Sequence, residues 1–137
     1  TCPRGGDGCG VCTSLQGAFE ITEETVADGN KDTMRMLHSG AAKVYWIKTQ
    51  KKYLDVAFTE FLKLIRKNAL IVCESNSLRK HIEPGLFLVL KNKSHTTYKS
   101  SATEVMSLAD KIITFDGNTF DFEVTNVVYD DNTWLLK

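Results

Sequence analysis

The chain has 137 residues, of which 42% are hydrophobic and 25% are charged, and this composition predicts a single globular domain over residues 1–137. Seventeen basic and seventeen acidic side chains cancel, which argues against nucleic acid or an anionic membrane as a partner. The longest apolar runs fall far short of the roughly 20 residues that cross a bilayer, so no membrane span is expected.

The cysteines and the first residues bear on the cellular compartment. Cys2, Cys9 and Cys12 crowd the start of the chain, and Cys73 lies in an apolar run. This distribution is unlike a secreted disulfide framework, and we therefore expect a reducing cytoplasm. The chain opens at Thr1 with neither an initiator Met nor a secretory signal, so we expect that its true start has been removed.

The first elements follow from local patterns. Residues 1–16 are rich in Gly and Cys and have no hydrophobic period, so we expect a loop. Residues 17–22 alternate between apolar and polar side chains and favour a short strand, although residues 23–26 offer equally good chemistry for the start of a helix. A short helix is predicted within residues 32–38, with a Ser-Gly pair as its stop.

The strongest patterns come next along the chain. Residues 42–48 are rich in β-branched and aromatic side chains and predict a strand. Apolar residues recur at three- and four-residue spacing from Tyr53 to Ile65, which predicts an amphipathic helix. Residues 70–73 form a continuous apolar run, which is typical of a strand buried on both faces of a parallel sheet.

A further alternation of helices and strands is predicted after this run. A short helix is expected from Ser77 and should end before Pro84. Residues 86–90 predict a second buried strand, and a polar loop over residues 91–101 leads to a helical turn or two over residues 102–109. A third strand is predicted over residues 111–115.

The end of the chain changes character. Residues 120–124 alternate strictly, and a polar turn separates two apolar runs at residues 127–129 and 134–136, which predicts a β-hairpin within residues 116–137. The alternation of strands and helices over residues 17–115 predicts right-handed crossovers and a three-layer α/β fold with a mainly parallel sheet.

One charged segment carries a family resemblance. Its pattern is Asp-x-x-Lys-Asp-Thr-x-Arg, followed by Gly40-Ala41 and a predicted strand. It resembles the D-x-x-G-K-D-S-x-R segment of the P-loop NTPase class, in particular the accessory proteins of molybdopterin-guanine dinucleotide synthesis. Asn30 stands where that family has glycine. The resemblance implies that the residues near the nucleotide or a partner are Asp28, Lys31, Asp32, Thr33 and Arg35.

An acidic residue follows the apolar run over residues 70–73. The run with Glu74 resembles that family's strand with its terminal acidic residue. A carboxylate at the carboxyl end of a parallel strand points into the ligand crevice and can organise a water of Mg²⁺, so Glu74 is the predicted catalytic residue. The polar residues 75–77 supply further donors in this interpretation, and helix capping is an equally good account of them.

A second polar segment follows the predicted strand over residues 86–90. Asn92 and Lys93 resemble the start of the N-K-x-D box that selects guanine, although His95 stands where the aspartate belongs. A solvated polar loop is the competing and more ordinary interpretation of this segment. The resemblance as a whole covers residues 28–114, where residues 107–113 resemble the closing strand of the family.

The phosphate-binding loop of the family is missing from this sequence. None of the nine glycines lies in a G-x-x-x-x-G-K-[ST] loop, which would precede every segment discussed above. Without its backbone amides and lysine we expect no hydrolysis, so NTPase activity requires an upstream loop.

The three early cysteines suggest a metal site independently of the resemblance. Cys2, Cys9 and Cys12 lie on a Gly-rich stretch, and the last two have the spacing seen in zinc and iron–sulfur sites. A fourth ligand is needed, and the candidates are Cys73, His38, His81 and His95. A redox dithiol and unligated cysteines remain as alternatives.

Together these observations give two hypotheses. The resemblance implies a nucleotide-binding accessory protein that takes GTP or ATP with Mg²⁺, serves the synthesis or delivery of a metal cofactor, and has a protein partner in cofactor assembly. The alternative is a non-enzymatic, degenerate P-loop-like domain that binds a metal or another protein. The sequence leaves a homodimer open under both hypotheses.

Overall fold

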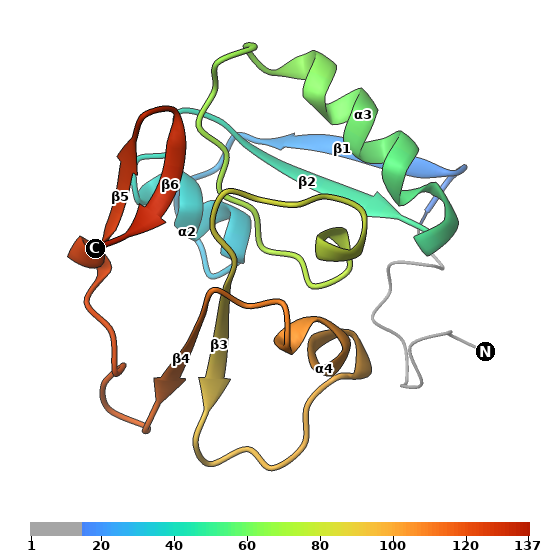
Figure 1. The fold of residues 1–137 in the computed structure, drawn as a ribbon. Coiled ribbons are helices and arrows are strands. Elements are labelled where there is room, and N and C mark those ends of the chain that lie inside the picture. Colours follow the sequence, from blue (N-terminus) through green and yellow to red (C-terminus); the bar gives the residue numbers. More distant parts are fainter. Residues whose placement is uncertain (1–14) are drawn as a thin grey trace. The chain divides into compact units, whose positions relative to one another are not determined.

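The computed structural model describes residues 15–137, which divide between Val72 and Cys73 into two compact units (Figure 1). We call the described residues up to Val72 unit 1 and those from Cys73 onward unit 2. This division does not test the single-domain prediction, which stays a prediction. Nearly all of the loop predicted over residues 1–16 lies outside the described residues.

Unit 1 is built on an antiparallel pair of strands, β1 (Phe19–Glu24) and β2 (Val44–Thr49). The register places Glu20 opposite Lys48, and their side chains form an ion pair at 3.6 Å. The same Lys48 ammonium lies 4.4 Å from the centre of the Trp46 ring. Both strands predicted for this part of the chain are therefore confirmed, each with a small shift of its ends.

One helix covers one face of this pair. The 3-10 turn η1 (Lys51–Tyr53) leads into α3 (Leu54–Leu64), which contacts both strands (Figure 1). Ala57 is completely buried, and the rings of Phe61 and Tyr45 pack edge to face with their centres 5.6 Å apart. The predicted amphipathic helix is confirmed, because its three- and four-residue apolar stripe is the face that meets the sheet.

The shorter helix of unit 1, α2 (Asp32–His38), lies between the two strands in the sequence. Its first turn carries Asp32, which suits the positive end of the helix dipole. It ends at Ser39 and Gly40, where Gly40 takes a φ of 100° and donates its N–H to the carbonyl of Leu37 at 3.1 Å. The predicted helix and its glycine stop are both confirmed.

Unit 2 contains one strand–helix–strand unit. The strands β3 (Leu88–Asn92) and β4 (Lys111–Phe115) are parallel, and α4 (Ser100–Met106) lies between them in the sequence. Val89, Val105 and Ile113, one from each element, form its small buried core. The strand over residues 111–115 is confirmed, whereas β3 and α4 each begin two residues away from their predicted starts.

A short 3-10 turn, η2 (Leu78–Lys80), replaces the helix predicted from Ser77. Leu78 is buried, and the backbone N–H of Leu78 donates to Ser75 Oγ at 3.2 Å. Lys80 forms an ion pair with Glu104 on α4, which joins this turn to the strand–helix–strand unit.

The end of unit 2 is a hairpin of β5 (Val127–Asp130) and β6 (Thr133–Leu136), preceded by the 3-10 turn η3 (Val124–Asn126). Asp131 and Asn132 form the turn and both take positive φ, 45° and 60°. This is the pattern of a type I′ turn, whose twist matches that of paired strands. The predicted terminal hairpin is confirmed over residues 127–136, whereas the alternating residues 120–124 form no strand.

The predicted three-layer fold with a mainly parallel sheet is wrong. Within the described residues the strands form three separate two-stranded sheets, of which only β3–β4 is parallel. The predicted order of strands and helices agrees with the structure along most of the described chain. This order does not specify which strands pair. Among residues 15–137, no helix is both long and apolar enough to cross a membrane.

The strand predicted over residues 70–73 is also absent. These residues have no regular secondary structure, and the side chains of Leu70 and Val72 are 54% and 79% exposed. A run of four apolar residues is too short to show the periodicity that identifies a strand. Whether it forms a strand depends on a neighbouring strand to pair with, and the local sequence does not reveal that neighbour.

Candidate functional site

The carboxylate of Glu24, at the end of β1, binds the chain just before the charged segment over residues 28–35 and one residue within it. Its Oε1 accepts hydrogen bonds from the backbone N–H groups of Val26 at 3.0 Å and Thr25 at 3.1 Å. Its Oε2 accepts a hydrogen bond from the hydroxyl of Thr33 on α2 at 2.8 Å. One side chain therefore ties a strand end, a loop and a helix together within unit 1. We call this arrangement the Glu24 clasp.

These hydrogen bonds favour the ionised form of the carboxyl group. The backbone N–H of Val26, followed by the hydroxyl of Thr33, lowers the pKa of Glu24 below its ordinary value of 4.5, and the charge of Lys31 adds to the effect. A lowered pKa in the folded chain means that the clasp contributes its stability above that ordinary value. The contribution is lost as the pH falls through the lowered pKa.

The charged segment over residues 28–35 remains open to solvent beside the clasp. Asp32 and Arg35 are 71% and 74% exposed, and their closest charged atoms are 4.0 Å apart. Asp28 and Lys31 are exposed as well. Thr33 is half-buried and its hydroxyl donates to Glu24, and its predicted role in ligand binding stays a prediction.

Glu74, the predicted catalytic residue, lies in unit 2 within an irregular and exposed segment. The premise that it ends a parallel strand is wrong, because residues 70–73, directly before it, form no strand. Its proposed contact with a magnesium-bound water stays a prediction without that geometric support. Cys73 beside it is exposed, and partial desolvation together with the Glu74 charge raises the pKa of its thiol.

Asn92 and Lys93 lie at the carboxyl end of β3, which is the edge where open α/β sheets bind ligands. The side-chain oxygen of Asn92 accepts the N–H of Ser94 at 2.9 Å, so it closes its own turn. The backbone N–H of Lys93 donates to the carbonyl of Phe115 at 2.8 Å, and its side chain is exposed. The predicted contacts of Asn92 and Lys93 with a nucleotide both stay predictions.

Asp116 was not predicted and lies at the matching end of β4. Because Asn92 pairs with Phe115 in the register, Lys93 and Asp116 follow the two strands at the same edge. The carboxylate of Asp116 accepts the N–H groups of Asn118 at 2.8 Å and Thr119 at 2.9 Å. These bonds, with a smaller contribution from the Lys93 charge, lower its pKa below the ordinary value of 3.8.

Sequence reasoning missed Glu24 and Asp116 for different reasons. The Asp116-Gly117-Asn118-Thr119 sequence is a strong signal for a turn closed by an aspartate side chain, and it could have been recognised. Glu24 gives no comparable signal, since its partner Thr33 lies nine residues away on another element.

A metal site is not supported within residues 15–137, where no group of three or more His, Cys, Asp or Glu side chains could hold an ion. The predicted ligands Cys2, Cys9 and Cys12 lie outside the described residues, so the hypothesis of a zinc ion or an iron–sulfur cluster stays a prediction.

The structure places the predicted site residues in two groups. Asp28, Lys31, Asp32, Thr33 and Arg35 come together in unit 1, and Glu74, Asn92 and Lys93 belong to unit 2. Comparisons of the chain with protein-family models, with curated proteins and with solved structures found no match. The resemblance to the molybdopterin-guanine dinucleotide accessory proteins therefore stays a prediction.

Proposed function

We propose that this chain is a nucleotide-binding accessory protein that takes GTP or ATP with Mg²⁺ and serves the synthesis or delivery of a metal cofactor. The observation that carries the proposal is the Glu24 clasp, which binds the backbone just before the charged segment and the Thr33 hydroxyl within it. The charged side chains of the segment stay exposed to solvent. A rigid support below exposed polar groups is what a binding site requires.

The side chains of the charged segment have the chemistry that a magnesium nucleotide needs. Lys31 and Arg35 are cations that donate charge-assisted hydrogen bonds to phosphate oxygens. Asp28 and Asp32 are carboxylates that can hold waters of a magnesium ion. Because these four charges cancel, the segment suits the magnesium complex of the nucleotide better than the free polyanion.

In this proposal, the charged segment binds the nucleotide and does not catalyse its hydrolysis. The sequence contains no glycine-rich phosphate loop with its lysine, and those groups supply most of the stabilisation of phosphoryl transfer in P-loop enzymes.

The test is a titration of the complete gene product with fluorescent GTP and ATP analogues, with and without Mg²⁺. We expect magnesium-dependent binding that weakens about tenfold in Lys31→Met and in Arg35→Met, the loss typical of one charge-assisted hydrogen bond. Lys67→Met and Arg66→Met remove the same charges from exposed positions of unit 1 and serve as matched controls. Equal affinity in all four variants, or no binding by a folded protein, would overturn the proposal.

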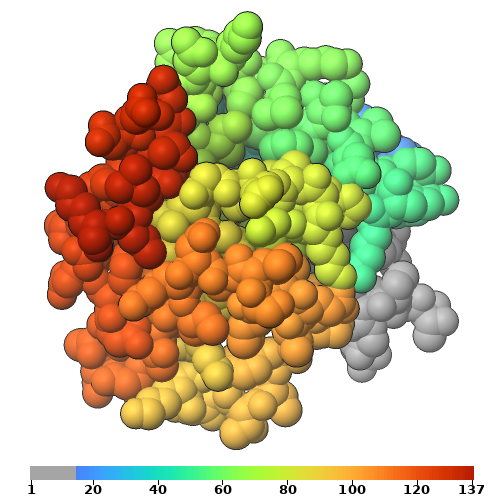
Figure 2. Space-filling view, viewed as in Figure 1, coloured from blue at the N-terminus to red at the C-terminus, as the bar shows by residue number. Residues whose placement is uncertain are grey.

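A second candidate function is a non-enzymatic protein-interaction module, as the sequence also suggested. The observation in its favour is the apolar surface of α3, where Val56, Leu62 and Leu64 are 50%, 43% and 53% exposed. Figure 2 shows the green atoms of this part of the chain at the surface. Exposed apolar side chains on a helix can take part in a contact with another protein.

Sedimentation equilibrium tests whether α3 mediates association between copies of the chain. If α3 mediates association between copies, the mass should rise with concentration, and Val56→Gln with Leu64→Gln should abolish the rise. Thr59→Gln, on the same helix, is the matched control. A mass that stays at one chain over the whole concentration range would exclude self-association, whatever the nucleotide titration shows.

A further inference from the structure

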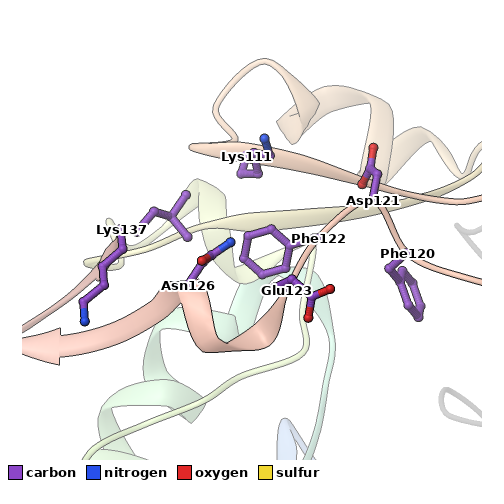
Figure 3. A pocket seen from close by; sticks show the side chains of 8 residues that line it. Lys111, Phe120, Asp121, Phe122, Glu123, Asn126 and Lys137 are labelled. Carbon is purple, nitrogen blue, oxygen red and sulfur yellow. The ribbon is translucent and has the colours of Figure 1, made fainter.

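A pocket of about 340 Å³ lies within unit 2, where the loop after β4, the turn η3 and the end of β6 meet. Figure 3 shows Phe122 and Asn126 near its centre, with Lys137 on the side of Asn126, Lys111 and Asp121 above them in this view, and Glu123 next to Phe122. Its size falls at the lower end of the range that holds small organic ligands. None of the residues predicted from the sequence to bind a ligand lines it.

The backbone around this pocket is fixed by hydrogen bonds. Asp121 Oδ1 accepts the N–H of Thr114 on β4 at 2.6 Å, and the N–H of Asp121 donates to the carbonyl of the same Thr114 at 3.0 Å. On the other side, the N–H of Lys137 donates to the carbonyl of Asn126 at 2.9 Å. The pocket is therefore formed before any ligand arrives.

Several polar side chains of the pocket are left unused. Within residues 15–137, the half-buried amide of Asn126 and the charged ends of Lys111, Glu123 and Lys137 make no hydrogen bond or ion pair. An amide that is partly removed from water and lacks a protein partner is a group that a ligand can satisfy. The ring of Phe122 beside it supplies a flat apolar wall.

The charges of the pocket indicate the chemical class of the ligand. Two lysines and two carboxylates line one space, so neither a simple anion nor a simple cation is favoured by the net charge. We propose that this pocket binds a small zwitterion with a flat apolar body, whose anionic end faces the lysines, whose cationic end faces Glu123, and whose body lies on Phe122. This proposal is independent of nucleotide binding in unit 1.

Three related probes test the charge requirement. Phenylalanine carries both charges, 3-phenylpropionate only the negative one and phenethylamine only the positive one. In ¹H–¹⁵N NMR titrations of the full chain, the side-chain amide of Asn126 should shift with phenylalanine, with a Kd on the order of 1 mM, as expected for so small a ligand. Each singly charged probe should bind about threefold more weakly, because it makes one exposed charge contact fewer.

Charge variants assign the two ends of the ligand. Lys111→Met with Lys137→Met should weaken the binding of phenylalanine and of 3-phenylpropionate but leave the binding of phenethylamine unchanged. Glu123→Gln should weaken the binding of phenethylamine and leave that of 3-phenylpropionate unchanged. Lys67→Met with Lys99→Met removes the same number of charges from exposed positions outside the pocket and is the control. The proposal is overturned if the three probes bind alike, if the pocket variants behave like the control, or if Asn126 does not respond to phenylalanine.

Discussion

Two carboxylates at strand ends make nearly the same hydrogen bonds in the two units, but they hold different lengths of chain. Glu24, the last residue of β1, accepts hydrogen bonds from two backbone N–H groups and from the hydroxyl of Thr33 on α2, nine residues away. Asp116 after β4 accepts two backbone N–H groups and, at 3.5 Å, the hydroxyl of Thr119 in its own loop. The hydrogen bonds that such a carboxylate accepts lower its pKa in both units. The position of its third partner decides whether it organises one turn or several elements.

The largest effect should come from Glu24→Ala. This substitution removes all three hydrogen bonds of the clasp at once and frees the loop over residues 25–31 from both β1 and α2. We expect backbone amide exchange at Val26 to accelerate roughly tenfold and nucleotide affinity to fall along with it. Hydrogen exchange followed by NMR measures the first effect. Unchanged exchange at Val26 would show that the clasp does not hold the loop in solution.

Thr33→Val should give a smaller effect of the same kind, because it removes only the bond to α2 and keeps the shape of the side chain. We expect exchange at Val26 to change less than threefold, while the pKa of Glu24 moves up toward its ordinary value. A carboxyl ¹³C titration measures this pKa. If Thr33→Val matches Glu24→Ala in every respect, the two backbone bonds contribute nothing.

Asp116→Asn tests whether the carboxylate of Asp116 holds only its own loop. The amide oxygen of asparagine can still accept the N–H groups of Asn118 and Thr119, so we expect only a local change in the loop over residues 116–119. Amide chemical shifts should change within this loop and not in α4. A loss of the α4 signals would show that Asp116 supports more of unit 2 than its hydrogen bonds indicate.

Acid should affect both carboxylates in the same direction. Each has a lowered pKa in the folded chain, so each contributes stability above its ordinary value, 4.5 for Glu24 and 3.8 for Asp116, and loses the contribution as the pH falls through the lowered value. Thermal unfolding between pH 7 and about pH 3 should show this loss, and Glu24→Gln should flatten the pH dependence. A wild-type chain that gains stability on acidification would contradict the sign.

Glu74→Gln is expected to have the smallest effect on the fold. Its side chain is exposed in irregular chain, and such substitutions change the free energy of unfolding by less than about 0.5 kcal/mol. If the complete gene product hydrolyses nucleotide with Mg²⁺, the same variant should abolish turnover without altering stability. Unchanged turnover would remove Glu74 from the predicted site.

The parts of the fold that the sequence predicted are those with a local signal. The apolar stripe of α3 and the Asp131-Asn132 turn each specify their element within a few neighbouring residues. Strand pairing is a long-range property, and the run over residues 70–73 shows the limit, since its composition suits a strand but nothing pairs with it. The same limit applied to the site, where the charged segment was found and the residue that supports it, Glu24, was not.

Gly85 shows how a missing side chain can constrain the evolution of a sequence. A Cβ at this position would lie 2.8 Å from Oγ1 of Thr133 and 3.4 Å from the backbone nitrogen of Trp134, both on β6. The loop before β3 and the terminal hairpin therefore approach so closely that a larger residue at position 85 would require the side chain of Thr133 to shift, although the two segments are far apart in the sequence. The residues at positions 85 and 133 are therefore expected to vary together.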